Sequence, residues 1–349
     1  MRVAIVGSGA IGRAYAVLAS RAGHDVAIWS PRGAAVPSAL AYSGIVEGRC
    51  EVGSVADVAD LGAADVVLVA IPATAYADVI PRVASHLRSA QFVFLSGALS
   101  LAPLWLAELA AEHGQRPVVA ASGTTVATAR TRDDGVAIMT IRTRLAIATL
   151  PVAATGKALA LMTQLFGDRF DAAANVLAVT LTNINPVAHA AMAIANLTRI
   201  ERGEAWPQYH YLTPAVARLV EAMDAERRAV AASFGAQVTT IEQHFQRSFD
   251  VPQTVLADIA AELHRRRGGP PGPTSLDTRF VLEDVPFGLV VNAALARVTN
   301  VATPVTDATI TLLSTLYQRD FRSANPLVAA LGLASSSRDA LLARCTQVA

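Results

Sequence analysis

The chain has 349 residues, of which 53% are hydrophobic and 5% aromatic, so it can form two domains with cores of small aliphatic side chains. A formal net charge of +1 argues against a nucleic-acid-binding platform or a polybasic membrane anchor. The two cysteines, Cys50 and Cys345, are far apart and form no metal or disulfide pattern, and we expect no metal site.

The first residues form an apolar strand without the charged and hydrophobic leader of a secreted protein, so we expect a cytoplasmic location. The most apolar segment, residues 172–198, is interrupted by asparagines, a proline and a histidine, and we do not expect it to span a membrane. The expected partners are therefore small-molecule substrates, with neither nucleic acid nor membrane, and a homodimer stays open.

The first 32 residues predict a strand, a glycine-rich turn, a helix and a second strand. The turn carries three glycines in G-x-G-x-x-G spacing inside a complete β-α-β pattern, which is typical of a dinucleotide site. Unpaired N–H groups at the start of the helix would bind the pyrophosphate. The expected cofactor-binding residues are Gly7, Gly9, Ala10, Ile11, Gly12, Ser30, Arg32, Ile71 and Pro72.

The end of the second strand indicates which cofactor is preferred. An NAD site usually carries Asp or Glu there for the ribose 2′-hydroxyl. This chain has Ser30 and Arg32 instead, and a guanidinium binds a 2′-phosphate through charge-assisted hydrogen bonds. We therefore predict NADP (NADPH) rather than NAD.

Apolar runs at 65–73, 91–97 and 116–123 alternate with helical segments and predict an α/β, Rossmann-type doubly wound parallel sheet. Ligands bind at the carboxyl ends of such strands, so residues 71–74 and 96–98 are expected to border the nicotinamide. Two runs, 135–141 and 145–151, are interpreted as edge strands that close a dinucleotide-binding domain of residues 1–150.

From residue 151 onward the pattern becomes helical. The segment 213–235 has Thr213 as an N-cap, Pro214 at the first helical position and Gly235 just past the end. Further helices are predicted within 153–167, 252–267 and 303–321. Residues 151–349 are therefore expected to form a mostly α-helical substrate and catalytic domain that closes over the cofactor.

The stretch LTNINPVAHA at 181–190 places polar side chains within an apolar segment. Pro186 either follows Asn185 as N-cap of a new helix or kinks a long one. In both cases Asn185, His189 and Asn196 lie on one helical stripe. The residues alone leave two interpretations open, a hydrogen-bonded core histidine or one wall of an active site.

Five further segments follow one another along the chain: NINPVAHAAMAIAN, TPAVARLVEAMDAER, RFVLEDVPFGL, TPVTDATITL and DFRSANPLVAALGL. In these segments, and in that order, the chain resembles the octopine/nopaline-type opine dehydrogenases, and the similarity covers nearly the whole chain. It implies an oxidoreductase that uses NAD(P)H to condense a 2-oxo acid reductively with an amino acid, which gives an N-(carboxyalkyl) amino acid. The same resemblance implies that His189 is the catalytic histidine and that Asp307 is its carboxylate partner.

These roles agree with the chemistry. A histidine can exchange protons near neutral pH, and a carboxylate on its far nitrogen fixes its tautomer. Both substrates are carboxylates, which arginine binds well. The expected substrate-binding residues are Asn185, Arg130, Arg279 and Tyr209. Glu283 and Asp284 are interpreted as structural residues that cap the turn before Pro286.

Two alternatives remain. One is an NADP-dependent reductase of a free 2-oxo acid, of the ketopantoate type, or of an imine; the ketopantoate type depends on a lysine in the second domain, and Lys157 is the single lysine of the chain. The other is a non-catalytic NADP-binding sensor, which would bind cofactor without turnover.

Overall fold

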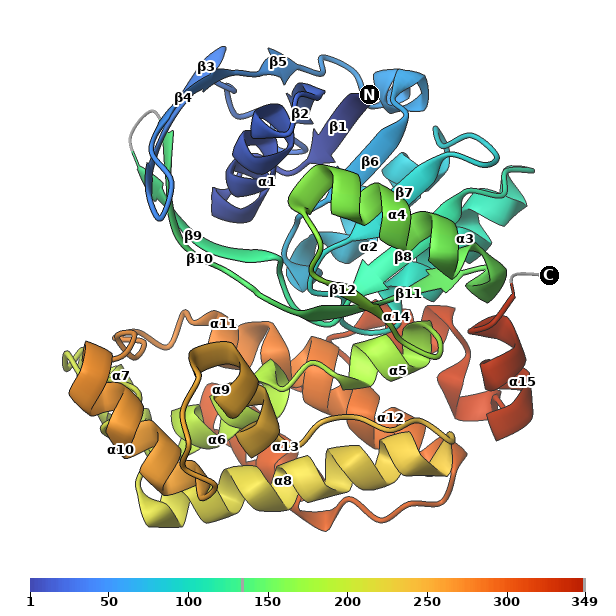
Figure 1. The fold of residues 1–349 in the computed structure, drawn as a ribbon. Coiled ribbons are helices and arrows are strands. Elements are labelled where there is room, and N and C mark those ends of the chain that lie inside the picture. Colours follow the sequence, from blue (N-terminus) through green and yellow to red (C-terminus); the bar gives the residue numbers. More distant parts are fainter. Residues whose placement is uncertain (133–134, 348–349) are drawn as a thin grey trace. The chain divides into compact units, whose positions relative to one another are not determined.

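The computed structural model describes residues 1–132 and 135–347, which divide into two compact units (Figure 1). Unit 1 comprises Met1–Thr180 together with the C-terminal residues from Leu342, and unit 2 comprises Leu181–Leu341. Their division differs from the boundary expected at residue 150, because the segment 151–172 packs on the first sheet.

Unit 1 is built on an eight-stranded sheet in the order β12-β11-β8-β7-β6-β1-β2-β5. The strands from β8 to β5 run parallel, and β1, β6 and β7 are buried along almost their whole length, as expected for a sheet covered on both faces. The strands are β1 (Arg2–Val6), β2 (Asp25–Trp29), β5 (Gly53–Ser54), β6 (Val66–Val69), β7 (Phe92–Leu95), β8 (Val118–Ser122), β11 (Leu145–Leu150) and β12 (Phe170–Ala172). The Rossmann-type doubly wound sheet predicted from the sequence is confirmed.

A second, four-stranded sheet has the order β4-β3-β10-β9. Its strands are β3 (Ala39–Gly44), β4 (Gly48–Glu51), β9 (Ala127–Arg132) and β10 (Gly135–Ile141). Helix α1 (Ala10–Arg21) lies between the two sheets: Tyr15 and Ala16 pack on the large sheet, whereas Ala14 and Val17 pack on the small one (Figure 1).

The two predicted edge strands are wrong in detail. β10 lies inside the small sheet between β3 and β9, and β11 pairs with β8 in antiparallel direction while β12 forms the edge beyond it. Helix α4 (Thr155–Phe166) buries Met162 and Phe166 in the core of the large sheet, so the apolar stripe of this helix belongs to unit 1. The other helices of unit 1 are α2 (Tyr76–Ala84), α3 (Ala102–Glu112) and most of α5 (Val176–Leu181), and α15 (Arg338–Arg344) crosses the unit boundary.

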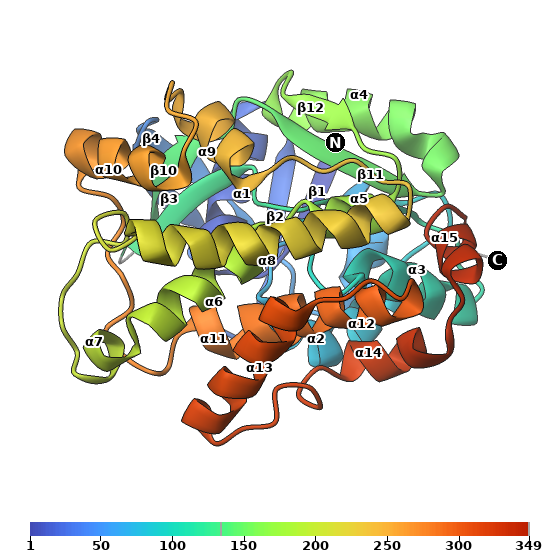
Figure 2. The same cartoon turned by 90° about the horizontal axis from the view of Figure 1, so that it is seen from below.

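Unit 2 is helical, as predicted. Its longest helix, α8, begins directly after Thr213, and Gly235 follows its end with φ +76°. α8 packs against α6 and α13 around one apolar core (Figure 2). The helices are α6 (Asn185–Ala195), α7 (Leu197–Glu201), α8 (Pro214–Ser233), α9 (Ile241–Phe249), α10 (Leu256–Arg267), α11 (Arg279–Leu282), α12 (Val290–Val298), α13 (Pro304–Tyr317) and α14 (Pro326–Ala330).

By length and composition alone, the apolar stretch Val176–Ala195 could cross a membrane. In the structure, however, 78% of the 18-residue segment that gives this result is buried inside the protein. The stretch is also divided into α5 and α6 by the residues between Leu181 and Asn185. It therefore serves here as core helices with a break between them.

Candidate active site

The glycine-rich turn of unit 1 has the shape of a dinucleotide cradle. Gly7 has φ +114°, and a Cβ there would lie 2.5 Å from the carbonyl oxygen of Ala70. A Cβ on Gly12 would lie 1.9 Å from the carbonyl oxygen of Gly7, so only glycine lets α1 approach β1 this closely. In contrast, a Cβ on Gly9 would meet nothing within 4 Å, which leaves open space directly over the start of α1.

The start of α1 is prepared for an anion. Gly9 is its N-cap, no side chain caps the helix, and the first turn carries no acidic residue, so the free N–H groups and the helix dipole favour phosphate. Arg13 holds the turn by donating from Nε to the Ser8 carbonyl at 3.0 Å and from a terminal nitrogen to the Gly135 carbonyl at 3.1 Å. These features fit the pyrophosphate of a nicotinamide dinucleotide.

The turn after β2 adjoins this cradle. Ser30 Oγ lies 3.0 Å from Ser8 Oγ and accepts a hydrogen bond from the Ala34 amide at 3.1 Å. The Arg32 side chain is exposed. Ile71 and Pro72 follow the buried strand β6, and Ile71 also contacts the position of a Cβ on Gly7, at 3.2 Å. Ala10 and Ile11 form the first turn of α1.

In unit 2, α6 begins after a break that the sequence indicated only in part. Asn183, rather than Asn185, supplies the side-chain acceptor: its Oδ1 accepts from the Asn185 amide at 3.0 Å. Ile184 is the N-cap and Asn185 is the first helical residue. Pro186 packs closely on Gly288, where a Cβ would lie 2.2 Å from a proline ring carbon. Of the two interpretations of Pro186, the structure has the new helix rather than a kinked one, and its N-cap is Ile184 rather than Asn185.

One turn further along α6, His189 forms a dyad with a buried carboxylate. Nδ1 of His189 lies 2.7 Å from Oδ2 of Asp284, and the side chains are 19% and 1% exposed. The imidazole also stacks on the Phe280 ring, with centroids 3.8 Å apart and an angle of 5°. Because Nδ1 faces Asp284, Nε2 is the nitrogen left for a substrate, and Nδ1–H donating to the carboxylate keeps Nε2 as an acceptor.

The expected partner Asp307 lies in a different interaction. Its Oδ1 accepts from Arg322 at 2.7 Å and from Arg297 at 3.1 Å, and its Oδ2 accepts from Thr303 Oγ1 at 3.2 Å. Asp307 is 37% exposed. The predicted pairing of Asp307 with His189 is wrong, and so is the interpretation of Asp284 as a turn cap alone.

Asp284 is held in place by an unusual turn. Residues Val285–Leu289 form one wide helical turn in which the Val290 amide donates to the Val285 carbonyl, a π-type geometry that is rare and common at functional sites. Asn325 Nδ2 donates to the Pro286 carbonyl at 3.0 Å. Oδ1 of Asp284 is buried and has no hydrogen-bond partner among the described residues.

The expected substrate residues lie in different places. Arg279 begins α11, next to Phe280; its side chain is 59% exposed and lies 3.9 Å from Glu283. Asn185 is partly exposed at the start of α6, one helical turn before His189. Tyr209 packs edge-on against Phe245 and Phe249. Arg130 is exposed on β9 of unit 1. Of these four residues, Asn185 and Arg279 adjoin elements of the dyad within unit 2.

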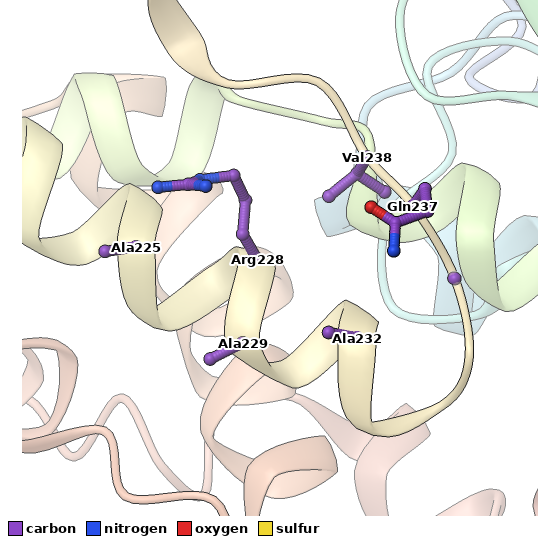
Figure 3. A pocket seen from close by; sticks show the side chains of 7 residues that line it. Ala225, Arg228, Ala229, Ala232, Gln237 and Val238 are labelled. Carbon is purple, nitrogen blue, oxygen red and sulfur yellow. The ribbon is translucent and has the colours of Figure 1, made fainter.

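The hollow drawn in Figure 3 is a separate feature. It has a volume of about 320 Å³ and lies between α8 and residues 236–238, lined largely by alanines. Its one charged lining side chain, Arg228, donates to Asp224 at 3.2 Å. It contains neither member of the His189–Asp284 dyad, so the dyad and the glycine cradle remain the candidate sites.

Comparisons with known proteins point to one family. The model for NAD/NADP octopine/nopaline dehydrogenase, alpha-helical domain, matches residues 172–317, and a model for NADP oxidoreductase, coenzyme F420-dependent, matches residues 2–96. An opine dehydrogenase of Arthrobacter sp. (strain 1C) is 32% identical over 274 residues, which cover 77% of this chain and 76% of that one.

Solved structures agree on the fold. Octopine dehydrogenase with NADH and L-arginine superimposes with a TM-score of 0.81 at 17% identity, over 99% of this chain and 98% of that one. Yersinopine dehydrogenase with NADP⁺ gives a TM-score of 0.71 at 16% identity, over 99% and 98% of the two chains.

Proposed function

We propose a specific reaction for this chain, which belongs to the opine dehydrogenase family and is therefore an NAD(P)-dependent dehydrogenase that acts on CH–NH bonds. It reductively condenses the amino group of an amino acid with a 2-oxo acid to an N-(carboxyalkyl) amino acid. The observation that carries our assignment of the catalytic residues is the His189–Asp284 dyad, in which the imidazole of His189 on α6 also stacks on the Phe280 ring of α11.

His189 exchanges protons during the condensation. Nε2 accepts a proton from the ammonium group of the amino acid, so that the free amine attacks the carbonyl carbon of the oxo acid and, after a proton moves from nitrogen to oxygen, gives a neutral carbinolamine. The imidazolium, stabilised by Asp284, returns its proton to the hydroxyl of this adduct, which leaves as water and gives a protonated imine. When bound, the reduced nicotinamide would supply the hydride that reduces the protonated imine to the secondary amine.

We assign Arg279 as the cation that binds a substrate carboxylate in unit 2. Its 59% exposed guanidinium stands on the same short helix as Phe280, and its contact with Glu283 at 3.9 Å is a loose one. A separation of 3.9 Å is too long for a hydrogen bond, so a substrate carboxylate can bind the exposed side of the guanidinium without breaking one. Bidentate geometry suits arginine for this role.

We propose that NADPH is preferred over NADH. Ser30 and exposed Arg32 follow β2, and none of residues 30–36 is acidic, so a 2′-phosphate meets positive rather than negative charge. Arg32→Asp is expected to shift the ratio of kcat/KM values toward NADH by at least about 10-fold, since a charge-assisted hydrogen bond is worth about 1.5–3 kcal/mol. Arg49→Asp, on exposed β4, is the matched control. An unchanged ratio in Arg32→Asp would remove this assignment.

The reaction is tested by following the absorbance of the reduced nicotinamide with a panel of 2-oxo acids, each with and without a panel of amino acids. Consumption that requires both partners is expected, and the most active pair identifies the product. Turnover with an oxo acid alone would instead indicate a simple 2-oxo acid reductase. The structure offers no lysine for the ketopantoate type of such chemistry in unit 2, because Lys157 is exposed on α4 of unit 1.

A further inference from the structure

A buried hydrogen-bond chain links α1 to the end of β7. Tyr15 has no exposed surface. Its hydroxyl oxygen accepts from the Val126 amide at 2.9 Å and is hydrogen-bonded to Ser96 Oγ. Ser96 directly follows β7 and is 8% exposed. The three groups connect the helix of the cradle, the main sheet and the segment before β9.

The direction of these hydrogen bonds follows from which groups can donate a proton. A backbone N–H only donates, so Tyr15 accepts from Val126. The phenolic proton of Tyr15 then needs an acceptor, because a buried donor without one costs about 1–3 kcal/mol, and Ser96 Oγ is the acceptor within reach. Burial raises the pKa of Tyr15 to about 12, so this proton stays on the phenol at neutral pH.

Ser96 is therefore left with a proton of its own to donate. Tyr15 is the partner of its hydroxyl among the residues that the structure describes. A second buried serine, Ser122 at the end of β8, is different because its hydroxyl donates to the Thr124 carbonyl at 2.7 Å. The proton of Ser122 is used within the protein, whereas that of Ser96 is available to a ligand.

The register of the sheet places Ser96 on the cofactor edge. Val6, Val69 and Leu95 are aligned across β1, β6 and β7, so the residues that follow them, Gly7, Ala70 and Ser96, form one row at the carboxyl ends. Two strand spacings, about 10 Å, separate Gly7 from Ser96. In a doubly wound fold the nicotinamide half extends from the first strand over these two strands.

We propose that the Ser96 hydroxyl, oriented by Tyr15, donates a hydrogen bond to the carboxamide oxygen of the nicotinamide and so holds the ring in one rotational position. Ser96 is thus a cofactor-contacting residue, and Tyr15 is a positioning residue that acts through it. The inference rests on the proposed use of a nicotinamide cofactor.

The test compares cofactor binding with and without the nicotinamide ring. The dissociation constants of NADPH and NADH are measured by calorimetry beside those of 2′-phospho-ADP-ribose and ADP-ribose, which lack the ring. Ser96→Ala is expected to weaken the complete cofactors about 3- to 10-fold, the value of one neutral hydrogen bond, and to leave the ring-free ligands unchanged. Ser96→Thr keeps the hydroxyl and should restore most of the loss.

Two further variants complete the design. Tyr15→Phe should weaken the complete cofactors about 2- to 5-fold, again without effect on the ring-free ligands, since one hydrogen bond that orients the donor is lost. Ser122→Ala should change neither. Equal weakening of both ligand types in Ser96→Ala, or no weakening at all, would overturn the proposal.

The result is independent of substrate turnover. If the wild-type protein binds the complete cofactors but oxidises them with no pair of substrates, the proposed reaction is wrong. The binding comparison for Ser96→Ala still tests whether Ser96 contacts the nicotinamide. If the wild-type protein binds neither complete cofactor, the proposed use of a nicotinamide cofactor and the proposed role of Ser96 are both wrong.

Discussion

Asp284→Asn is the substitution that best separates the observed dyad from the partner expected from sequence. The amide is nearly the same size as the carboxylate, so the π-type turn and the stack of His189 on Phe280 can persist. The change removes the negative charge 2.7 Å from Nδ1. It also lets an amide N–H donate to Nδ1, which places the imidazole proton on Nε2, where a base is required.

The expected loss in activity is large. In serine proteases the equivalent change lowers kcat about 10⁴-fold through the wrong tautomer, and loss of a general acid–base contributes about 10²–10⁴. We therefore expect kcat to fall about 10²- to 10⁴-fold, or about 3–5.5 kcal/mol in the activation free energy. His189→Ala should reach the same level, and the double variant should add little because the two residues act as one unit.

Stability should respond much less than activity. Asp284→Asn loses a charge-assisted hydrogen bond worth about 1.5–3 kcal/mol. It also removes a charge from a side chain that is 1% exposed and whose Oδ1 has no hydrogen-bond partner in the part of the chain that the structure describes, which lowers the desolvation cost. The free energy of unfolding should change by less than about 2 kcal/mol. Cofactor binding, measured by calorimetry, should stay at the wild-type level.

Asp307→Asn is the matched control, an identical replacement in the same unit. Its carboxylate pairs with two partly exposed arginines, and such pairs contribute about 0–1 kcal/mol. We expect kcat within about 3-fold of wild type. The assay is steady-state oxidation of the reduced cofactor with the best substrate pair. A loss of 10²-fold or more in Asp307→Asn, with Asp284→Asn close to wild type, would refute the assignment made from the geometry.

Three further predictions concern stability. Arg227→Ala leaves the 3% exposed Asp224 carboxylate without its main partner, and it should lower the free energy of unfolding in urea by about 3–5 kcal/mol, whereas exposed Arg218→Ala on the same helix should change it little. Glu226→Ala removes both acceptors of the first amides of α13, at 2.8 and 2.9 Å, and should cost about 1–3 kcal/mol; an unchanged urea midpoint would contradict this. Burial raises the pKa of Tyr15 to about 12, so its contribution to stability is complete below about pH 10, where the tyrosine of the unfolded chain ionises, and is lost as pH rises through about 12. Over this range the free energy of unfolding of the wild type should fall by about 3 kcal/mol more than that of Tyr15→Phe, and parallel pH profiles would exclude the effect.

The first half of the fold was predictable because its signals are local. Each buried parallel strand is a short apolar run, and the glycine spacing follows from close approaches between backbones: Gly7 to Ala70, and α1 to β1. The edges of the sheet were not predictable in the same way. The runs at 135–141 and 145–150 read alike, yet β10 joins a second sheet over α1 while β11 extends the first. That choice depends on which face of α1 each strand covers, which is a tertiary property.

The carboxylate that pairs with His189 was missed for a related reason. Both Asp284 and Asp307 precede or begin helices in unit 2, and both lie far from His189 in sequence. Residue type alone does not separate them. What separates them is burial: Asp284 is 1% exposed, while Asp307 is 37% exposed and lies within reach of two arginines.

A local signal for Asp284 was nevertheless present in the sequence RFVLEDVPF. Phe280 and Asp284 are four residues apart, a spacing that places two side chains on one face of a helix. In the structure both contact the same imidazole, one stacking on its face and the other hydrogen-bonded to its edge. Since Pro286 has no amide to donate and the wide turn begins just before it, the chain can hold Asp284 at the end of this face and still continue into α12. An aromatic residue and an acidic residue at positions i and i+4 before such a turn together indicate that the acid pairs with a histidine, whereas an acidic residue alone does not indicate this.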